Sequence, residues 1–478
     1  MTKFKLLFTL SIIVPILMLL TFLSYYNRFP TGDDAWFAEE TYWLLKDGVI
    51  RSEFFRGLLG WEKQLFVSHK LFLCFGSIMM LIGGSSLYVL KLTSLLFLAL
   101  LVFLFKGYIA HRQLEKTSLY IVLFLLFSNT LIVKMSFEYR PEVMMMTLGF
   151  ASYLLIQYQQ KYLVALGGVL SGMALLCHLN GIIYIIAGFF MFIFSGKKIK
   201  ALIFIVFASL TSIFYFYDIW QANGFDVWLY QFRNDPATQN AFGLVNKLKV
   251  MLSFPSIFFK SPQEMAISIL LISFCWTYRK KLNELPRNLI VYAIVLVISF
   301  WLITKRASGL YEMLFIPIMM TFIIELFGLI EDKPSFKLSK PILFAFFLYF
   351  VIGFVGIIQL IHKIHSRPFL PDKYAALRKF IPAKSKGLVP LQFFFNEYEN
   401  HESLLCFENF DFQLAQSTLK ADTESLANWA RKNNVKFILF DYKNNKANFF
   451  PKPREVLKGY QLSYFDGDFA VYVELKNM

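Results

Sequence analysis

Long runs of apolar residues recur along most of this chain and constrain its fold more than any other feature. Each run has about 17 to 22 residues, which lets a helix cross a hydrocarbon core of about 30 Å. Of the 478 residues, 57% are hydrophobic and 17% are charged. Soluble domains are nearer half apolar and a quarter charged. The sequence therefore predicts a polytopic α-helical membrane protein.

The positions of the apolar runs predict about 11 transmembrane helices. We expect them at residues 5–24, 87–105, 117–134, 142–158, 162–178, 180–195, 201–217, 264–278, 288–304, 311–329 and 341–361. A further apolar stretch at 65–82 is either a short span or a helix lying at the interface. If it does not cross, and the N-terminus is cytoplasmic, the loops rich in Lys and Arg lie inside, as the positive-inside rule favours. The C-terminus then lies outside.

The chain is predicted to divide into a transmembrane domain at 1–361 and an external domain at 362–478. Two large external loops, at about 27–86 and 218–263, belong to the first domain. The tail is more polar, with helix-like and strand-like patterns and a hairpin signal at Asp466-Gly467-Asp468. We therefore expect interfacial helices in the first external loop and a small soluble α/β domain at the C-terminus.

Two acidic residues, Asp33 and Asp34, stand side by side directly after the first span. One interpretation is helix capping, because residues 34–45 have helical spacing and carboxylates at a helix start complement its dipole. The other is a catalytic carboxylate, because placing two adjacent carboxylates at a membrane surface costs free energy and so indicates a function. The residues alone leave both interpretations open.

Other charged residues of the external turns are candidate binding groups. Glu62 and Lys63 are either a solvated pair or a site at which Lys63 contacts a phosphate. Arg140 and Glu142 lie in a turn between two spans, either as helix-end charges or facing an active cavity. The residues themselves do not decide between these interpretations.

Lys and Arg usually lie in the cytoplasmic loops of membrane proteins. Basic residues predicted on the outer side are therefore candidates for binding an anionic group. Arg306 lies between two predicted spans and is one such candidate. Arg233 in the second loop is a weaker candidate of the same kind. His178 is predicted to be a histidine at the end of a span. His362 and His365 have helical spacing but no evident carboxylate partner. We therefore expect no metal site and no cofactor, with a divalent cation left open.

These stretches, in this order, resemble the type C glycosyltransferases, and in particular the bacterial branch related to protein O-mannosyltransferases and lipid A aminoarabinose transferases. The resemblance covers about residues 1–330. It is carried by Asp33-Asp34-Ala35-Trp36, Lys63-Gln64-Leu65, Gly83-Gly84-Ser85-Ser86 with Lys91, Arg140-Pro141-Glu142, His178-Leu179-Asn180-Gly181, and Arg306 with Tyr311 and Pro317. The chain departs from the family pattern at Asp34, where Glu is usual, and lacks the two prolines after Lys63.

The resemblance implies an enzyme that moves a sugar from a polyprenyl-phosphate donor to a lipid, glycan or protein acceptor at the outer face of the membrane. It implies inversion at the sugar, with Asp33 as general base and Asp34 as an orienting group. It assigns the donor-phosphate contacts to Lys63, Arg140, Arg306 and Tyr311. It also implies a bacterial inner-membrane protein with a periplasmic active site, modifying lipopolysaccharide or another cell-envelope glycan.

Two other classes compete with this hypothesis. A secondary transporter or flippase would carry ionisable groups or broken helices near the bilayer midplane, whereas charges here cluster at loop ends. A non-catalytic membrane scaffold with an external interaction domain is the second alternative. Nucleic acid is not expected as a partner, because the net charge of +16 comes mostly from short loops between spans.

Overall fold

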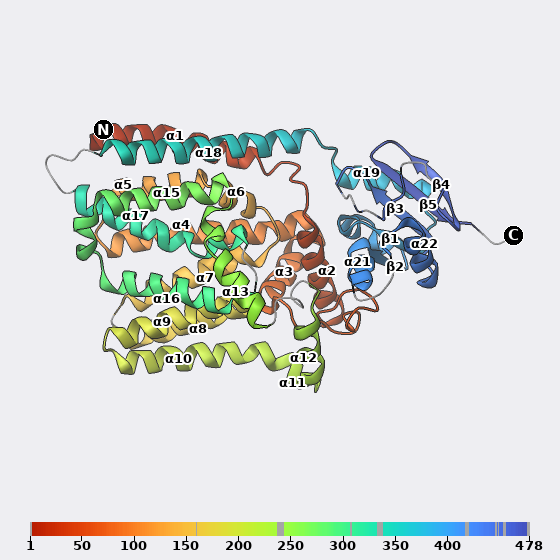
Figure 1. Cartoon of the computed structure of the whole chain (residues 1–478), viewed down its shortest axis with the longest axis horizontal. Coiled ribbons are helices and arrows are strands. Elements are labelled where there is room, and N and C mark those ends of the chain that lie inside the picture. The colour runs from red at the N-terminus through yellow and green to blue at the C-terminus, as the bar shows by residue number, and fades with distance from the viewer. Residues whose placement is uncertain are drawn as a thin grey trace.

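The chain folds into a stack of long helices with a small β-sheet beyond one end of the stack (Figure 1). The computed structural model describes residues 2–158, 160–236, 243–305, 308–331, 338–415, 420–444, 447, 449–452 and 456–475. The N-terminal helix runs beside the last long helix, which leads directly into the C-terminal domain. The first and the last long helix of the membrane part are therefore neighbours in space.

The helix stack consists of apolar helices that pack side by side. Its members are α1 (Lys3–Leu23), α4 (Leu87–His111), α5 (Lys116–Phe127), α7 (Pro141–Ile156), α8 (Lys161–Cys177), α9 (Ile182–Phe194), α10 (Lys198–Ser212), α15 (Pro262–Thr277), α16 (Arg287–Ile303), α17 (Ile316–Glu331) and α18 (Lys340–His365). Large apolar side chains such as Phe8, Phe103 and Phe347 are exposed on these helices. An apolar outer surface of this kind suits contact with lipid, where each backbone polar group is satisfied inside its own helix.

Judged by length and composition, fewer helices are able to cross the membrane than the sequence predicts. In the described part of the chain, four helices are long and apolar enough to cross: Lys3–Leu23, Leu87–His111, Lys198–Gln221 and Lys340–Phe380. A fifth candidate is the pair Leu244–Phe259 and Pro262–Thr277, bent by 82°. Six further apolar helices have only 10–17 residues. The chain is a multi-pass membrane protein, and the expected count of about 11 spans is not confirmed.

Short helices fill the ends and turns of the stack. These are α2 (Gly32–Asp47), α3 (Lys70–Gly83), α6 (Thr130–Met135), α11 (Tyr217–Gln221), α12 (Phe225–Asn234), α13 (Leu244–Ser253), α14 (Ser256–Phe259), η1 (Leu179–Gly181), η2 (Ile213–Phe216), η4 (Arg279–Glu284) and η5 (Gly309–Leu314). In Figure 1, α2 lies between the helix stack and the C-terminal domain. It ends at Gly48, whose φ of 72° closes the helix in the left-handed conformation.

The C-terminal domain is built on a five-stranded sheet with the order β2-β1-β3-β5-β4. Its elements are α19 (Leu370–Leu377), η6 (Arg378–Phe380), β1 (Lys386–Val389), η7 (Leu391–Phe393), α20 (Phe394–Glu397), η8 (Tyr398–Asn400), β2 (Ser403–Cys406), α21 (Phe407–Ala415), α22 (Thr423–Lys432), β3 (Phe437–Asp441), β4 (Tyr460–Phe465) and β5 (Phe469–Glu474). β1 pairs in parallel with β2 and β3, and β5 pairs antiparallel with β3 and β4. The hairpin predicted around Gly467 is confirmed as the β4–β5 turn.

The C-terminal domain is bound to the loop at 27–86 that was predicted to be external. The side-chain amide of Asn409 in α21 donates hydrogen bonds of 3.0 Å to the carbonyl oxygens of Phe54 and Arg56. On α2, the Trp43 ring meets the Tyr398 ring edge-on, with centroids 5.1 Å apart. Buried residues of the helix stack and of the sheet belong to one continuous hydrophobic core. The domain therefore covers one side of α2.

Candidate active site

Asp34 is the buried member of the acidic pair and acts as a structural hub. Its carboxylate accepts hydrogen bonds from the backbone N–H of Tyr139 at 2.7 Å and of Thr31 at 3.0 Å. Thr31 is the N-cap of α2 and accepts in return from the Asp34 N–H, which completes a capping box. The ammonium of Lys91, itself buried, lies 3.4 Å from the same carboxylate. The helix-capping interpretation is therefore confirmed for Asp34.

Asp33 has a different environment, although it is the next residue along the chain. About half of its side chain is exposed, and its Oδ2 accepts a hydrogen bond from Nη1 of Arg140. The remaining guanidinium donors of Arg140 go to Glu142, with Nη2–Oε1 at 2.8 Å and Nε–Oε2 at 3.2 Å. One arginine thus joins an accessible carboxylate to a buried one.

The charge state of Arg140 is fixed by these neighbours. Burial alone lowers the pKa of a guanidinium, but Glu142 and Asp33 outweigh burial and raise the pKa of Arg140. The fork of donors is suited to bidentate contact with carboxylate or phosphate oxygens. The site therefore presents a permanent cation beside an accessible carboxylate.

Two histidines stack next to this arginine. The rings of His69 and His178 are parallel within 19°, with centroids 4.7 Å apart. The Nδ1 of His178 accepts a hydrogen bond from the backbone N–H of Asn180 at 3.0 Å, which leaves Nε2 to carry the proton of the neutral ring. Burial, with a smaller effect of His178, lowers the pKa of His69 to about 3. The pair is therefore neutral at physiological pH.

His69 was not among the predicted site residues, and the resemblance matched the lysine element of the first loop to Lys63-Gln64-Leu65. The structure instead brings His69, at the start of α3, against the predicted residue His178. The signal that was available is the polar run Ser68-His69-Lys70 at the beginning of the apolar stretch 65–82. Polar residues entering an apolar segment are expensive unless they have partners.

A further buried carboxylate near Asp34 belongs to Glu138. Burial, and then the charge of Asp34, raise the pKa of Glu138 to about 7. Lys91 and Lys134 act in the opposite direction, and the Lys134 ammonium is 3.9 Å from Glu138. The Lys91 ammonium also donates to the backbone carbonyl of Arg28 at 3.1 Å. Lys91 therefore offsets the repulsion between the carboxylates of Asp34 and Glu138.

The other predicted site residues are dispersed. Lys63 is exposed, and Glu62 accepts a hydrogen bond of 3.2 Å from the Gly57 N–H. Tyr311 in η5 lies near His178, with ring centroids 6.5 Å apart. Arg233 is exposed on α12, and Arg306 lies outside the described residues. The structure thus brings together Asp33, Arg140, Glu142, His178 and Tyr311 and leaves the phosphate roles of Lys63 and Arg233 without a supporting contact.

No group of three or more His, Cys, Asp or Glu side chains among the described residues is placed to hold a metal ion. The charge of the site is instead supplied by Arg140 and Lys91, each within reach of a carboxylate. The donor set visible here is that of an anion-binding site.

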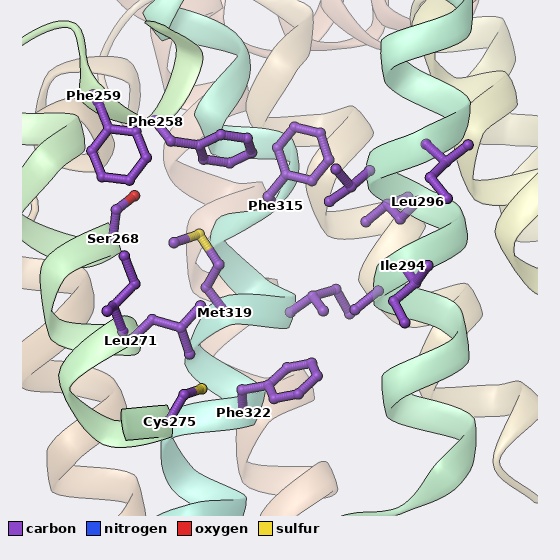
Figure 2. A pocket seen from close by; sticks show the side chains of 15 residues that line it. Phe258, Phe259, Ser268, Leu271, Cys275, Ile294, Leu296, Phe315, Met319 and Phe322 are labelled. Atoms are coloured by element: carbon purple, nitrogen blue, oxygen red, sulfur yellow. The ribbon is translucent and has the colours of Figure 1, made fainter. Parts of the chain in front are cut away.

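An apolar groove of about 440 Å³ opens among the helices of the stack (Figure 2). Phe258 and Phe259 of α14 lie at one end, and Leu271 and Cys275 of α15 face Met319 and Phe322 of α17 across it. α16 closes the other side with Ile294 and Leu296. Ser268 is the one hydroxyl among the lining side chains. A groove of this composition fits a hydrocarbon chain.

Comparison with solved structures identifies a shared architecture. ArnT from Cupriavidus metallidurans bound to undecaprenyl phosphate matches with a TM-score of 0.60 at 12% identity, over 97% of this chain and 98% of that one. The apo state of ArnT gives 0.62 at 11% identity, over 97% of both chains. The oligosaccharyltransferase AglB from Archaeoglobus fulgidus, in complex with an inhibitory peptide and a dolichol-phosphate, matches with a TM-score of 0.50 at 12% identity. This match covers 89% of this chain and 69% of AglB.

No protein-family model matches the sequence, and no curated protein sequence matches it significantly. The likeness therefore rests on the fold, and it extends beyond residues 1–330 to nearly the whole chain, the C-terminal domain included. The expected helical membrane fold with a small C-terminal sheet is confirmed, and this chain shares the architecture of ArnT.

Proposed function

We propose that this protein is a membrane glycosyltransferase that moves a sugar from a polyprenyl-phosphate donor to a lipid, glycan or protein acceptor at the outer face of the membrane. The observation that carries the proposal is the contact between the accessible carboxylate of Asp33 and the partly buried guanidinium of Arg140. Transfer from a lipid phosphate needs both a base for the acceptor and a cation for the leaving group.

In this mechanism Asp33 removes the proton from the acceptor hydroxyl as its oxygen bonds to the anomeric carbon. The bond between that carbon and the phosphate oxygen breaks, and its electron pair leaves with the polyprenyl phosphate. The sugar passes through an oxocarbenium-like state, as in glycoside hydrolysis. Because no covalent sugar–enzyme intermediate forms, the anomeric configuration inverts.

Arg140 is proposed to stabilise the charge on the departing phosphate. Its Nη1 pairs with Asp33 in this structure, while Glu142 binds Nη2 and Nε of the guanidinium. A donor phosphate competes with Asp33 for Nη1 and so releases the carboxylate to act as base. Glu142 is therefore a positioning residue, and Tyr311 lies beside His178, with ring centroids 6.5 Å apart.

The apolar groove of Figure 2 is proposed to hold part of the donor's prenyl chain. Two facts support this assignment: the groove is nearly free of polar lining atoms, and the similarly folded ArnT has been solved with undecaprenyl phosphate. We further propose that several of the shorter apolar helices also cross the membrane, with the N-terminus cytoplasmic and the C-terminal domain periplasmic in a bacterial inner membrane.

The test uses purified full-length protein, radiolabelled polyprenyl-phosphate sugars and a glycolipid extract of the cell envelope. The proposal predicts label in the glycolipid fraction and release of polyprenyl phosphate. The same preparation in vesicles, with the labelled donor on one side only, reports movement of the lipid across the bilayer. Movement without transfer, from folded protein, would contradict the enzyme and favour the flippase alternative.

A further inference from the structure

Two cavities lie at the junction between the helix stack and the C-terminal domain, separate from the groove of Figure 2. The first, of about 270 Å³, is lined by Arg28 and Lys91 from the helix stack and by Phe369 and Gln392 from the C-terminal domain. The second has about 340 Å³. Ser85 and Phe395 line both cavities, so the two adjoin. We call them together the junction cleft.

The second cavity has an aromatic wall. Tyr42 of α2 meets Phe394 at a ring-centroid distance of 5.7 Å and Tyr398 at 5.5 Å, and Phe394 meets Tyr398 at 4.4 Å. Tyr42 and Tyr398 are half-buried, so part of each ring faces the cavity. Such rings combine a flat apolar face with a polar edge, which suits the apolar face and the hydroxyl rim of a sugar ring.

A carboxylate with an unused oxygen lines the same cavity. The side chain of Glu397 is fully buried, and its Oε2 accepts from Nε of Arg378 at 2.6 Å and from Nδ2 of Asn400 at 3.1 Å. Its Oε1 is buried and has no hydrogen-bond partner among the described residues. A buried carboxylate oxygen without a donor is costly, so the cavity is expected to receive a ligand that donates hydrogen bonds there.

The first cavity extends from this wall toward the acidic pair of α2. Lys91 lines the cavity and its ammonium lies 3.4 Å from Asp34, the neighbour of Asp33. A chain of sugars lying along the cleft would therefore run from the aromatic wall toward the acidic pair. The volume of the aromatic cavity lies within the range of about 300–1,000 Å³ that is usual for small-ligand sites.

We propose that the junction cleft binds the glycan of the acceptor, with one sugar ring against Tyr42 and Tyr398 and its hydroxyl groups donating to Oε1 of Glu397. This inference rests on the proposed function, because it assigns the acceptor of that reaction to the class of glycans. It gives the C-terminal domain a role in substrate binding, since Glu397 and Tyr398 belong to that domain.

The test is saturation-transfer NMR on full-length protein in lipid nanodiscs with six methyl glycosides as probes: glucoside, galactoside, mannoside, rhamnoside, arabinoside and N-acetylglucosaminide. The wild type is expected to saturate the ring protons of at least one of them. Tyr398→Ala and Glu397→Gln are each expected to reduce that signal at least fivefold. Tyr398→Phe, which keeps the ring, and Glu424→Gln, an exposed acid of the same domain, are expected to retain it.

Absence of a signal from all six glycosides with folded wild-type protein would overturn the inference. A signal that is equally strong in Tyr398→Ala and Glu397→Gln would overturn it as well. Asp33→Asn is expected to keep the signal, because Asp33 is not among the residues that line the cleft. Glycan binding without any sugar transfer would contradict the proposed function alone, and transfer without binding in the cleft would contradict this inference alone.

Discussion

The backbone N–H of Tyr139 donates a 2.7 Å hydrogen bond to Oδ1 of Asp34, and this contact joins α2 to the turn that carries Arg140. Because Asp33 and Arg140 are the chain neighbours of these two residues, the bond fixes the spacing of the exposed carboxylate and the guanidinium. The buried acid therefore positions the accessible one.

Removal of the Asp34 carboxylate is expected to destabilise the protein strongly. In Asp34→Ala the buried Lys91 ammonium loses its carboxylate and the Tyr139 N–H loses its acceptor. Breaking a buried ion pair of this kind costs about 3–5 kcal/mol. The measurement is the unfolding temperature in detergent, with Asp226→Ala as the control at an exposed acid. An unfolding temperature equal to that of the wild type would contradict the role of Asp34 as a hub.

Replacement of Arg140 by lysine is expected to keep the charge and lose the function. Lysine cannot contact Asp33 and Glu142 at the same time with a planar fork of donors. We expect the rate of transfer to fall by about 100- to 1,000-fold, as when one stabilising donor is removed from an anion site. Turnover measured at saturating donor checks this. Turnover within threefold of the wild type would show that any cation suffices at this position.

The pH dependence of stability is expected to change when His69 is replaced by phenylalanine. The folded protein keeps His69 neutral, with a pKa of about 3, whereas the unfolded chain protonates it near pH 6.5. The wild type therefore loses stability from this group as the pH falls below 6.5, by up to about 2 kcal/mol at pH 5. His69→Phe removes this loss.

The comparison is the difference between unfolding temperatures at pH 7.5 and pH 5.0 for the two proteins. We expect a smaller difference in His69→Phe, in which an aromatic ring still stacks on His178. An identical difference in both proteins would mean that His69 is charged in the folded state.

Docking of the C-terminal domain depends on Asn409. Its side chain is buried and bonds to the carbonyl oxygens of Phe54 and Arg56, so Asn409→Leu leaves both without this donor. Losing two hydrogen bonds costs about 1–3 kcal/mol in total, because the Phe54 carbonyl keeps the Cys406 N–H as a donor at 3.3 Å. Limited proteolysis is expected to release the C-terminal domain faster from this variant than from Asn428→Leu, whose site is exposed. Equal rates would show that other contacts suffice to hold the domain.

The sequence predicted the class of fold well, because long apolar runs have few solutions other than membrane helices. It counted the spans less well, since helices such as α5 and α9 are shorter than the apolar runs that contain them. The structure breaks these runs at caps and turns, for example at Asn129, which caps α6. Hydropathy does not register such breaks.

The site was predicted in part, for a physical reason. Asp33 and Asp34 are equivalent in the sequence, and their roles separate only where Asp34 meets the Tyr139 N–H, 105 residues away. Lys63 was selected because Lys63-Gln64-Leu65 resembles the lysine element of the family, whereas His69 forms a contact that no local pattern reveals. Convergence of distant turns is set by tertiary packing, and a single sequence does not display it.

The most direct test of the account is the transfer rate of Asp33→Asn beside wild type and Asp226→Asn, with binding of polyprenyl phosphate measured on the same preparations. If Asp33 is the general base, its amide variant loses transfer by about 100- to 10,000-fold. It is expected to bind the carrier at least as tightly as the wild type, because Arg140 no longer pairs with a carboxylate at this position. Full transfer activity in Asp33→Asn would contradict the central claim.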